Sequence, residues 1–147
     1  SAKGIGAGFP LGATLVSERV GSVLPAGCHG GTYNNNPLAM AVGNAALDLV
    51  LADGLLQHVM AMGELLASGL KKLQSAYPDK IRDVRGAGLI LGLEPVIDAR
   101  ALAATLLDHG LVTSATVTGV IRLVPPLIIT AEHVGEALAI IESAVKE

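Results

Sequence analysis

The sequence predicts an α/β protein made of two unlike parts. From residue 54 onward, hydrophobic periodicity and turn residues indicate the order helix, strand, helix, strand, strand, helix, which is the pattern of a compact α+β unit. Residues 1–53 predict one strand, a long loop and an apolar helix, which is part of a hydrophobic core and not a whole one. We therefore expect residues 1–53 to be a segment of a larger domain and residues 54–147 to form a small domain.

The first part begins with turn residues. Glycines at positions 4, 6 and 8 and a proline at position 10 favour a loop over a helix, and the run LGATLVS at residues 11–17 predicts a buried strand. Ser17 is expected to cap a short helix that ends at Leu24.

A polar, glycine-rich loop, PAGCHGGTYNNN at residues 25–36, separates this helix from the next, and long ordered loops are usually functional. Asn36 before Pro37 combines a capping side chain with proline at the first helical position, so a helix is predicted from there to residue 52. Because this helix is apolar on nearly every side, we expect it to be buried all round.

Asp53 and Gly54 end that helix. Apolar positions spaced by three and four from Leu55 predict a long amphipathic helix that ends at Tyr77, before a proline. The run VRGAGLILGLE at residues 84–94 predicts a strand whose glycines allow close backbone approach.

Asp98 predicts the cap of a helix that stops near Gly110. Two strands, at residues 111–115 and 119–124, are expected to pair as a hairpin. Thr130 predicts the cap of the last helix, which carries apolar residues on one face.

Composition excludes several classes of function. Net charge is −3 without a basic block, which gives nucleic acid no electrostatic footprint. The uncharged run at residues 20–47 is broken by glycines, prolines and asparagines, so it is not expected to cross a membrane. The single cysteine, Cys28, excludes an internal disulfide and favours a reducing compartment, for which the cytoplasm is the simplest choice.

Three positions could carry chemistry, each with an ordinary alternative. Lys3, among small residues, could be a Schiff-base lysine, although a lone lysine there is more often merely solvated. The loop from His29 to Thr32 could ligate a phosphate through backbone N–H groups and a hydroxyl, or be a plain turn. Arg122 lies in an apolar strand and should meet a carboxylate, from the protein or from a ligand, and the protein partner is favoured from the residue alone.

Other candidate sites fail on context. The glycines after Lys3 follow no predicted strand and open no helix, so a dinucleotide-binding motif is not supported. Cys28 and His29 lack a third orienting group for nucleophilic catalysis. The four histidines, at positions 29, 58, 109 and 133, show no metal-ligand spacing, and no metal site is predicted.

Four motifs together resemble the successive signatures of class III aminotransferases, which are pyridoxal-phosphate enzymes of fold type I. They are KGIGAGFPLGA from Lys3, HGGTY followed by NPLA from His29, RGAGL from Arg85 and RLVPPL from Arg122. The segment NPLAMAVGNAALDLVLADGLLQH, residues 36–58, is most similar to the bacterial acetylornithine aminotransferase branch.

The resemblance implies a role for each candidate residue. Lys3 matches the lysine that binds pyridoxal 5'-phosphate and moves a proton on the substrate. Thr32 matches the threonine whose hydroxyl binds the cofactor phosphate of the neighbouring subunit, which implies a homodimer. Arg122 matches the arginine that binds the carboxylate of glutamate or 2-oxoglutarate. The implied reaction transfers the terminal amine of N-acetylornithine to 2-oxoglutarate, a step of arginine biosynthesis.

The sequence also departs from the family. Asn34 and Asn35 stand where glycines are usual, and residues 113–119 replace a turn rich in proline, alanine and glycine, which leaves the shape of both loops open. The acid that pairs with the pyridinium nitrogen, the aromatic that stacks on the ring and the main phosphate loop precede the lysine in this family and have no counterpart here. We therefore expect a C-terminal fragment that does not transaminate alone.

Two alternatives stay open. One is another class III enzyme that acts on ornithine or 4-aminobutyrate, because most discriminating contacts lie outside this sequence. The other is a non-catalytic α+β binding module, which would form no Schiff base at Lys3.

Overall fold

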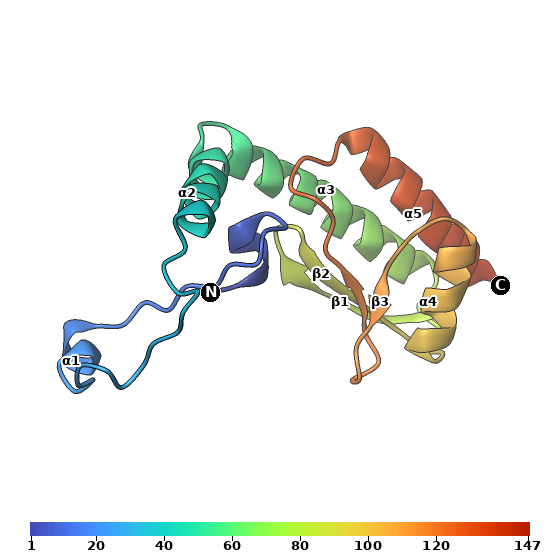
Figure 1. The fold of residues 1–147 in the computed structure, drawn as a ribbon. Helices are drawn as coiled ribbons and strands as arrows, with labels where there is room; N and C mark the ends of the chain where they lie inside the picture. The colour runs from blue at the N-terminus through green and yellow to red at the C-terminus, as the bar shows by residue number, and fades with distance from the viewer. The chain divides into compact units, whose positions relative to one another are not determined.

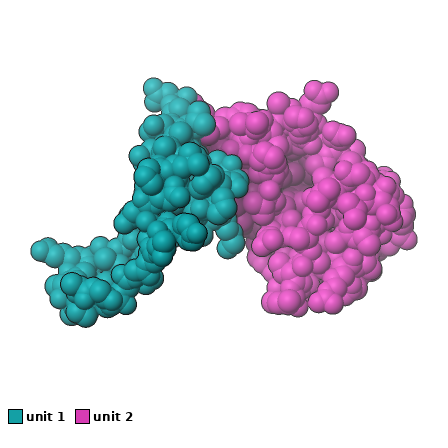
Figure 2. Space-filling view, viewed as in Figure 1, with its two compact units in different colours: residues 1–53 teal, residues 54–147 magenta.

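A computed structural model describes all 147 residues and divides the chain into two compact units, unit 1 at Ser1–Asp53 and unit 2 at Gly54–Glu147 (Figure 2). Unit 1 contains only helical elements, which are the 3₁₀ helix η1 (Lys3–Gly6), α1 (Glu18–Gly21) and α2 (Pro37–Leu51). Unit 2 contains α3 (Leu55–Ala76), β1 (Ile81–Ala87), β2 (Ile90–Pro95), α4 (Ala99–Asp108), β3 (Ser114–Ala115), β4 (Ile121–Leu123) and α5 (Ala131–Lys146).

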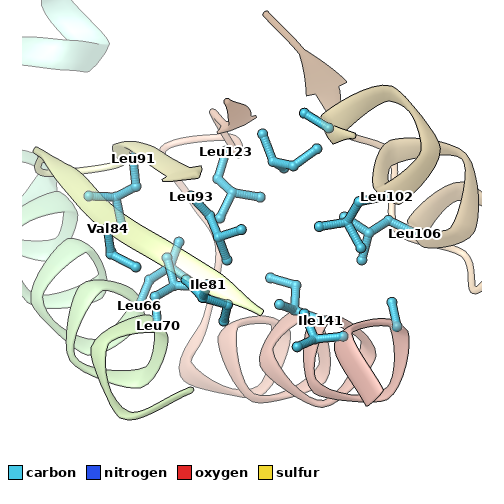
Figure 3. Close-up of a cluster of buried hydrophobic side chains, with 14 of the residues drawn as sticks. Leu66, Leu70, Ile81, Val84, Leu91, Leu93, Leu102, Leu106, Leu123 and Ile141 are labelled. Atoms are coloured by element: carbon cyan, nitrogen blue, oxygen red, sulfur yellow. The ribbon is translucent and has the colours of Figure 1, made fainter. Parts of the chain in front are cut away.

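Unit 2 is built on a four-stranded antiparallel sheet with the strand order β1-β2-β4-β3 (Figure 1). Alternation along the strands sends one set of side chains toward α3, α4 and α5, and all three helices contribute to the same core (Figure 3). That core contains Leu66, Leu70, Ile81, Val84, Leu91, Leu93, Leu102, Leu106, Leu123 and Ile141. The helices therefore cover one face of the sheet, and the opposite, outer face carries the polar side chains of the strands.

The run predicted as a single strand at residues 84–94 is a hairpin instead. Ala87 pairs with Ile90, so Gly88 and Leu89 form the turn, and Gly88 has a positive φ of 53°. The prediction was wrong because apolar residues run through the turn and hide it. The expected close approach is confirmed at Gly86, where a Cβ atom would lie 2.1 Å from the carbonyl oxygen of Ile90.

Capping side chains begin three helices as predicted, whereas Ser17 precedes α1 without a side-chain capping bond. The side chain of Asn36 accepts hydrogen bonds from the N–H groups of Leu38 and Ala39, and Asp98 does the same at the start of α4. Thr130 forms a capping box with His133, which opens α5. The hairpin of β3 and β4 is also confirmed.

The segment between β3 and β4, which departs from the family pattern, closes through its own hydrogen bonds. The backbone N–H of Thr116 donates to the carbonyl of Val120 at 2.8 Å, and the Thr116 hydroxyl accepts from the N–H of Val120 at 3.1 Å. A threonine and Gly119, with φ of 81°, therefore form this turn in place of the usual residues.

Several predictions for unit 1 were wrong. Residues 3–6 form η1 instead of a loop, and the helix after Ser17 ends at Gly21 instead of Leu24. Residues 11–17 form no strand and Leu15 is 86% exposed, because unit 1 offers no second strand to pair with. The helix α2 is not buried all round: only Ala39, Gly43 and Ala46 are buried, and Leu49 is 70% exposed. Unit 1 by itself therefore has little apolar core.

No single helix is long and apolar enough to span a membrane, and only α2 and α3 taken together as a bent pair reach that length and composition.

Candidate functional site

Lys3 begins η1 in a strained backbone conformation. Its φ of 59° lies in the left-handed region, which is uncommon for residues other than glycine and which often marks functional positions. Its side chain is exposed and forms neither an ion pair nor a hydrogen bond. The Lys3 amine is therefore free of protein partners.

Small residues hold η1 against α2. A Cβ atom on Gly6 would lie 3.1 Å from the Cβ of Leu11, and a Cβ on Gly43 of α2 would lie 2.6 Å from Leu11 Cδ2. Leu11 thus fits where both glycines lack a side chain, which fixes the element that carries Lys3. Around Lys3 itself, Gly4 and Gly8 have no atoms within 4 Å of a hypothetical Cβ, so the space beside the lysine is open.

Thr32 lies in the glycine-rich loop that precedes α2. Its side chain is exposed and its hydroxyl has no partner. A Cβ on the neighbouring Gly31 would lie 3.1 Å from the Asn34 side-chain oxygen, so Asn34 lies over Gly31. Asn35 has a φ of 57°, and it therefore adopts the left-handed conformation that a glycine would take more easily. Residues 32–35 therefore form a turn that includes both asparagines.

Arg122 lies on β4 and points to the outer face of the sheet. Its neighbours Ile121 and Leu123 are 1% and 7% exposed, whereas Arg122 is exposed and forms neither an ion pair nor a hydrogen bond. The expectation that a protein carboxylate would pair with Arg122 was wrong, because strand alternation places the guanidinium in solvent and removes the cost of leaving it unpaired. The guanidinium is available to a ligand carboxylate.

The acidic side chains on the same face have other partners. Glu94 of β2 accepts hydrogen bonds from Arg82 and Arg85 of β1, both at 2.9 Å, and Asp83 accepts from Arg85. The bond from Arg82, then that from Arg85, holds the pKa of Glu94 below its ordinary value. The hydrogen bond to Asp83, and after it the hydrogen bond to Glu94, raises the pKa of the Arg85 guanidinium. This network is the part of the site that sequence reasoning missed, because it depends on the hairpin turn that was not recognised.

The structure places Lys3 and Thr32 in unit 1 and Arg122 in unit 2, and no hydrogen bond joins Lys3 to Thr32. The distance from Arg122 to the other two residues depends on the relative positions of the units, which are not determined (Figure 1). Cys28 is an exposed free thiol with no bond to His29. His58 binds the carbonyl of Ile129 at 2.7 Å and so joins α3 to the loop before α5.

A cavity of about 570 Å³ lies in unit 2. Apolar side chains around β4 and α5, such as Leu123, Pro126 and Ile140, line it, and Arg122 is not among them. The cavity therefore adds nothing to the candidate site.

Comparison with known proteins identifies relatives of the whole chain. The family model described as aminotransferase class-III matches residues 1–145. The acetylornithine aminotransferase of Brucella melitensis is 46% identical over 145 residues, which is 99% of this chain and 36% of that relative. The acetylornithine aminotransferase of Agrobacterium fabrum is 48% identical over 97% of this chain and 36% of its own length. The chain therefore spans about a third of the curated relatives it matches.

Solved structures agree in fold. An ornithine aminotransferase from Plasmodium yoelii superposes with a TM-score of 0.89 at 32% identity, over 99% of this chain and 39% of that one. An acetylornithine aminotransferase from Elizabethkingia anophelis gives a TM-score of 0.80 at 35% identity, over 90% of this chain and 34% of that one.

Proposed function

The chain belongs to the class-III aminotransferase family, and on that premise we propose that it supplies Lys3, Thr32 and Arg122 to the active site of a transaminase that acts on N-acetylornithine and 2-oxoglutarate. The family is pyridoxal-phosphate-dependent. The observation that carries the proposal is the 46–48% identity to acetylornithine aminotransferases over nearly the whole chain.

The residues present suit pyridoxal phosphate. Lys3 offers an amine without a competing partner, beside glycines that leave room, and Thr32 offers an unpartnered hydroxyl in a loop with adjacent glycines. When bound, the cofactor supplies an electron sink that stabilises negative charge on the substrate carbon. We assign Lys3 Nζ to hold the cofactor and to transfer a proton at that carbon.

Arg122 is assigned to the carboxylate of the oxo acid or of glutamate. A guanidinium binds a carboxylate through two parallel hydrogen bonds, which orients the substrate as well as attracting it. Strand β4 holds Arg122 between two buried neighbours, so its backbone is fixed while its fork stays in solvent.

Residues 1–53 are assigned to the end of the large cofactor-binding domain and residues 54–147 to the small domain. We also propose a homodimer, in which Thr32 binds the phosphate group held by the partner subunit. We also propose that the protein works in a reducing compartment such as the cytoplasm, because Cys28 is the single cysteine of this sequence and no disulfide can form within it.

A second donor is supported by a specific observation. The similarity to an ornithine aminotransferase, with a TM-score of 0.89, makes ornithine the main competitor of N-acetylornithine. Rates with N-acetylornithine, ornithine and 4-aminobutyrate, measured as glutamate formed from 2-oxoglutarate by a complete enzyme that contains this chain, decide between them, and we expect the highest kcat/KM with N-acetylornithine.

A variant pair tests the assignment of Lys3 in the same assay. Lys3→Ala should lower kcat by at least about 100-fold, since the proton-transfer group is removed, whereas Lys71→Ala, which removes an exposed lysine of α3, should leave kcat unchanged. Equal activity of the two variants would rule out the role of Lys3.

A further inference from the structure

The register of the sheet places two arginines on either side of a glycine. Arg85 of β1 and Arg122 of β4 both pair with Gly92 of β2, so the three residues form one row across the outer face. Directly paired residues of antiparallel strands point to the same side of a sheet. Arg85 and Arg122 therefore flank Gly92 on that face. The strand between them carries no side chain at this point, and Val120 Cγ1 would lie 2.8 Å from a Cβ on Gly92, so Val120 covers the glycine.

Glu94 is the acid that β2, the strand between the two arginines, places on their face of the sheet. It lies two residues after Gly92 on β2 and thus on the same face, diagonal to Arg122. Diagonal neighbours have Cα atoms about 7–8 Å apart, which long side chains can bridge. Glu94 could therefore pair with Arg122, and such a pair would compete with a substrate carboxylate.

In the structure this competition does not occur, because Glu94 is already engaged. Its two carboxylate oxygens accept from Arg82 and Arg85 separately, and Asp83 binds the same Arg85 nitrogen. The positive charges of Arg82 and Arg85 are thus balanced by the negative charges of Asp83 and Glu94. Arg122 keeps an uncompensated positive charge on this face.

We infer that Arg85 is a positioning residue for the carboxylate site: by binding Glu94 and Asp83, it keeps the guanidinium of Arg122 free for the substrate. This inference rests on the proposed function for the identity of the ligand, but the pairing of Arg122 can be observed without ligand. It gives a role to the arginine of the RGAGL motif, which the proposed reaction does not otherwise use.

The test follows the side-chain Nε–H signal of Arg122 by NMR in the 147-residue chain. Arg85→Met keeps the apolar stem and removes the charge, so Glu94 is expected to turn to Arg122 and shift that signal in the absence of ligand. Adding Glu94→Gln in the same chain should return the signal to its wild-type position. Glu94→Gln alone should leave it in place, because Glu94 does not contact Arg122 in the wild type.

Titration with 2-oxoglutarate gives the functional consequence. Arg85→Met should raise the Kd at Arg122 by about two- to fivefold, the strength of one exposed ion pair, and the double variant should restore it. If only long-range charge matters, Glu94→Gln should change the Kd by the same factor in the wild type and in the Arg85→Met variant. Equal factors in the two proteins would overturn the inference.

The outcomes separate the two proposals. If 2-oxoglutarate does not perturb Arg122 in the wild type, the assignment of the carboxylate site fails while the ligand-free shift still tests the pairing. If 2-oxoglutarate binds at Arg122 but Arg85→Met moves neither the signal nor the Kd, Arg85 has no positioning role and the proposed function stands.

Discussion

At the scale of single residues, Lys3, Thr32 and Arg122 are exposed and unpaired, which agrees with the ligand-binding roles proposed for them. The residue types of all three could be found from sequence, since lysine, a glycine-rich loop and an arginine in a strand each indicate a chemistry. The solvent exposure of Arg122 could not, because an apolar run such as VIRLV does not tell which face of a sheet is covered. The partners of Glu94 could not be predicted from sequence either, because they depend on the register of the β1–β2 hairpin.

Glycine substitutions test the packing that positions the hairpin. A Cβ on Gly63 of α3 would lie 2.5 Å from the carbonyl oxygen of Gly88 in the turn, and backbone atoms cannot move aside cheaply. Gly63→Ala should therefore lower the free energy of unfolding by about 1–3 kcal/mol, measured by urea denaturation.

Gly135 provides the matched control, because it is also inside a helix but has nothing within 4 Å of a hypothetical Cβ. Gly135→Ala should raise the free energy of unfolding by about 0.5–1 kcal/mol through helix propensity. A gain in stability for both variants would show that α3 and the turn are not in close contact.

At the scale of elements, predictions from local capping residues agree with the structure better than predictions of which segments are buried. Caps at Asn36, Asp98 and Thr130 act within one turn of helix, so the neighbouring residues were enough to predict them. The strand at residues 11–17 and the burial of α2 depend on partners distant in sequence, and these predictions were wrong. Hydrophobicity indicates that a segment can be covered, but not what covers it.

The capping box of α5 has a measurable contribution. The hydroxyl of Thr130 accepts from the N–H of His133, and the N–H of Thr130 donates to His133 Nδ1 at 3.1 Å. Thr130→Ala removes one of these bonds and should cost about 1 kcal/mol in a thermal or urea unfolding experiment.

Ser75→Ala is the comparison, since Ser75 is exposed near the end of α3 and its hydroxyl only bonds back to the carbonyl of Lys71. Ser75→Ala should leave the free energy of unfolding unchanged or raise it slightly. If Thr130→Ala proved as harmless as Ser75→Ala, the cap would not stabilise α5.

At the scale of the whole molecule, the two units differ in how much core they contain. The buried cluster in unit 2 draws on every helix of that unit and on strands β1, β2 and β4, whereas in unit 1 the buried apolar side chains are Ala39 and Ala46. Small buried side chains contribute little hydrophobic free energy. Unit 1 is therefore expected to open at much lower free energy than unit 2.

Amide hydrogen exchange measures this difference directly. Amides of α2 should exchange faster than those of α3 and α5, with protection in α3 and α5 near the global stability of unit 2. Equal protection in α2 and α5 would mean that unit 1 is as stable as unit 2, contrary to its small core.

We propose that Lys3 holds pyridoxal phosphate, and covalent labelling shows which lysine binds it. The protein is incubated with a small excess of pyridoxal phosphate, reduced with borohydride, digested and analysed by mass spectrometry. The chain contains four other lysines, Lys71, Lys72, Lys80 and Lys146, which serve as internal controls. We expect the label mainly on Lys3. An even distribution over the five lysines, or an unlabelled Lys3, would show that Lys3 does not hold the cofactor.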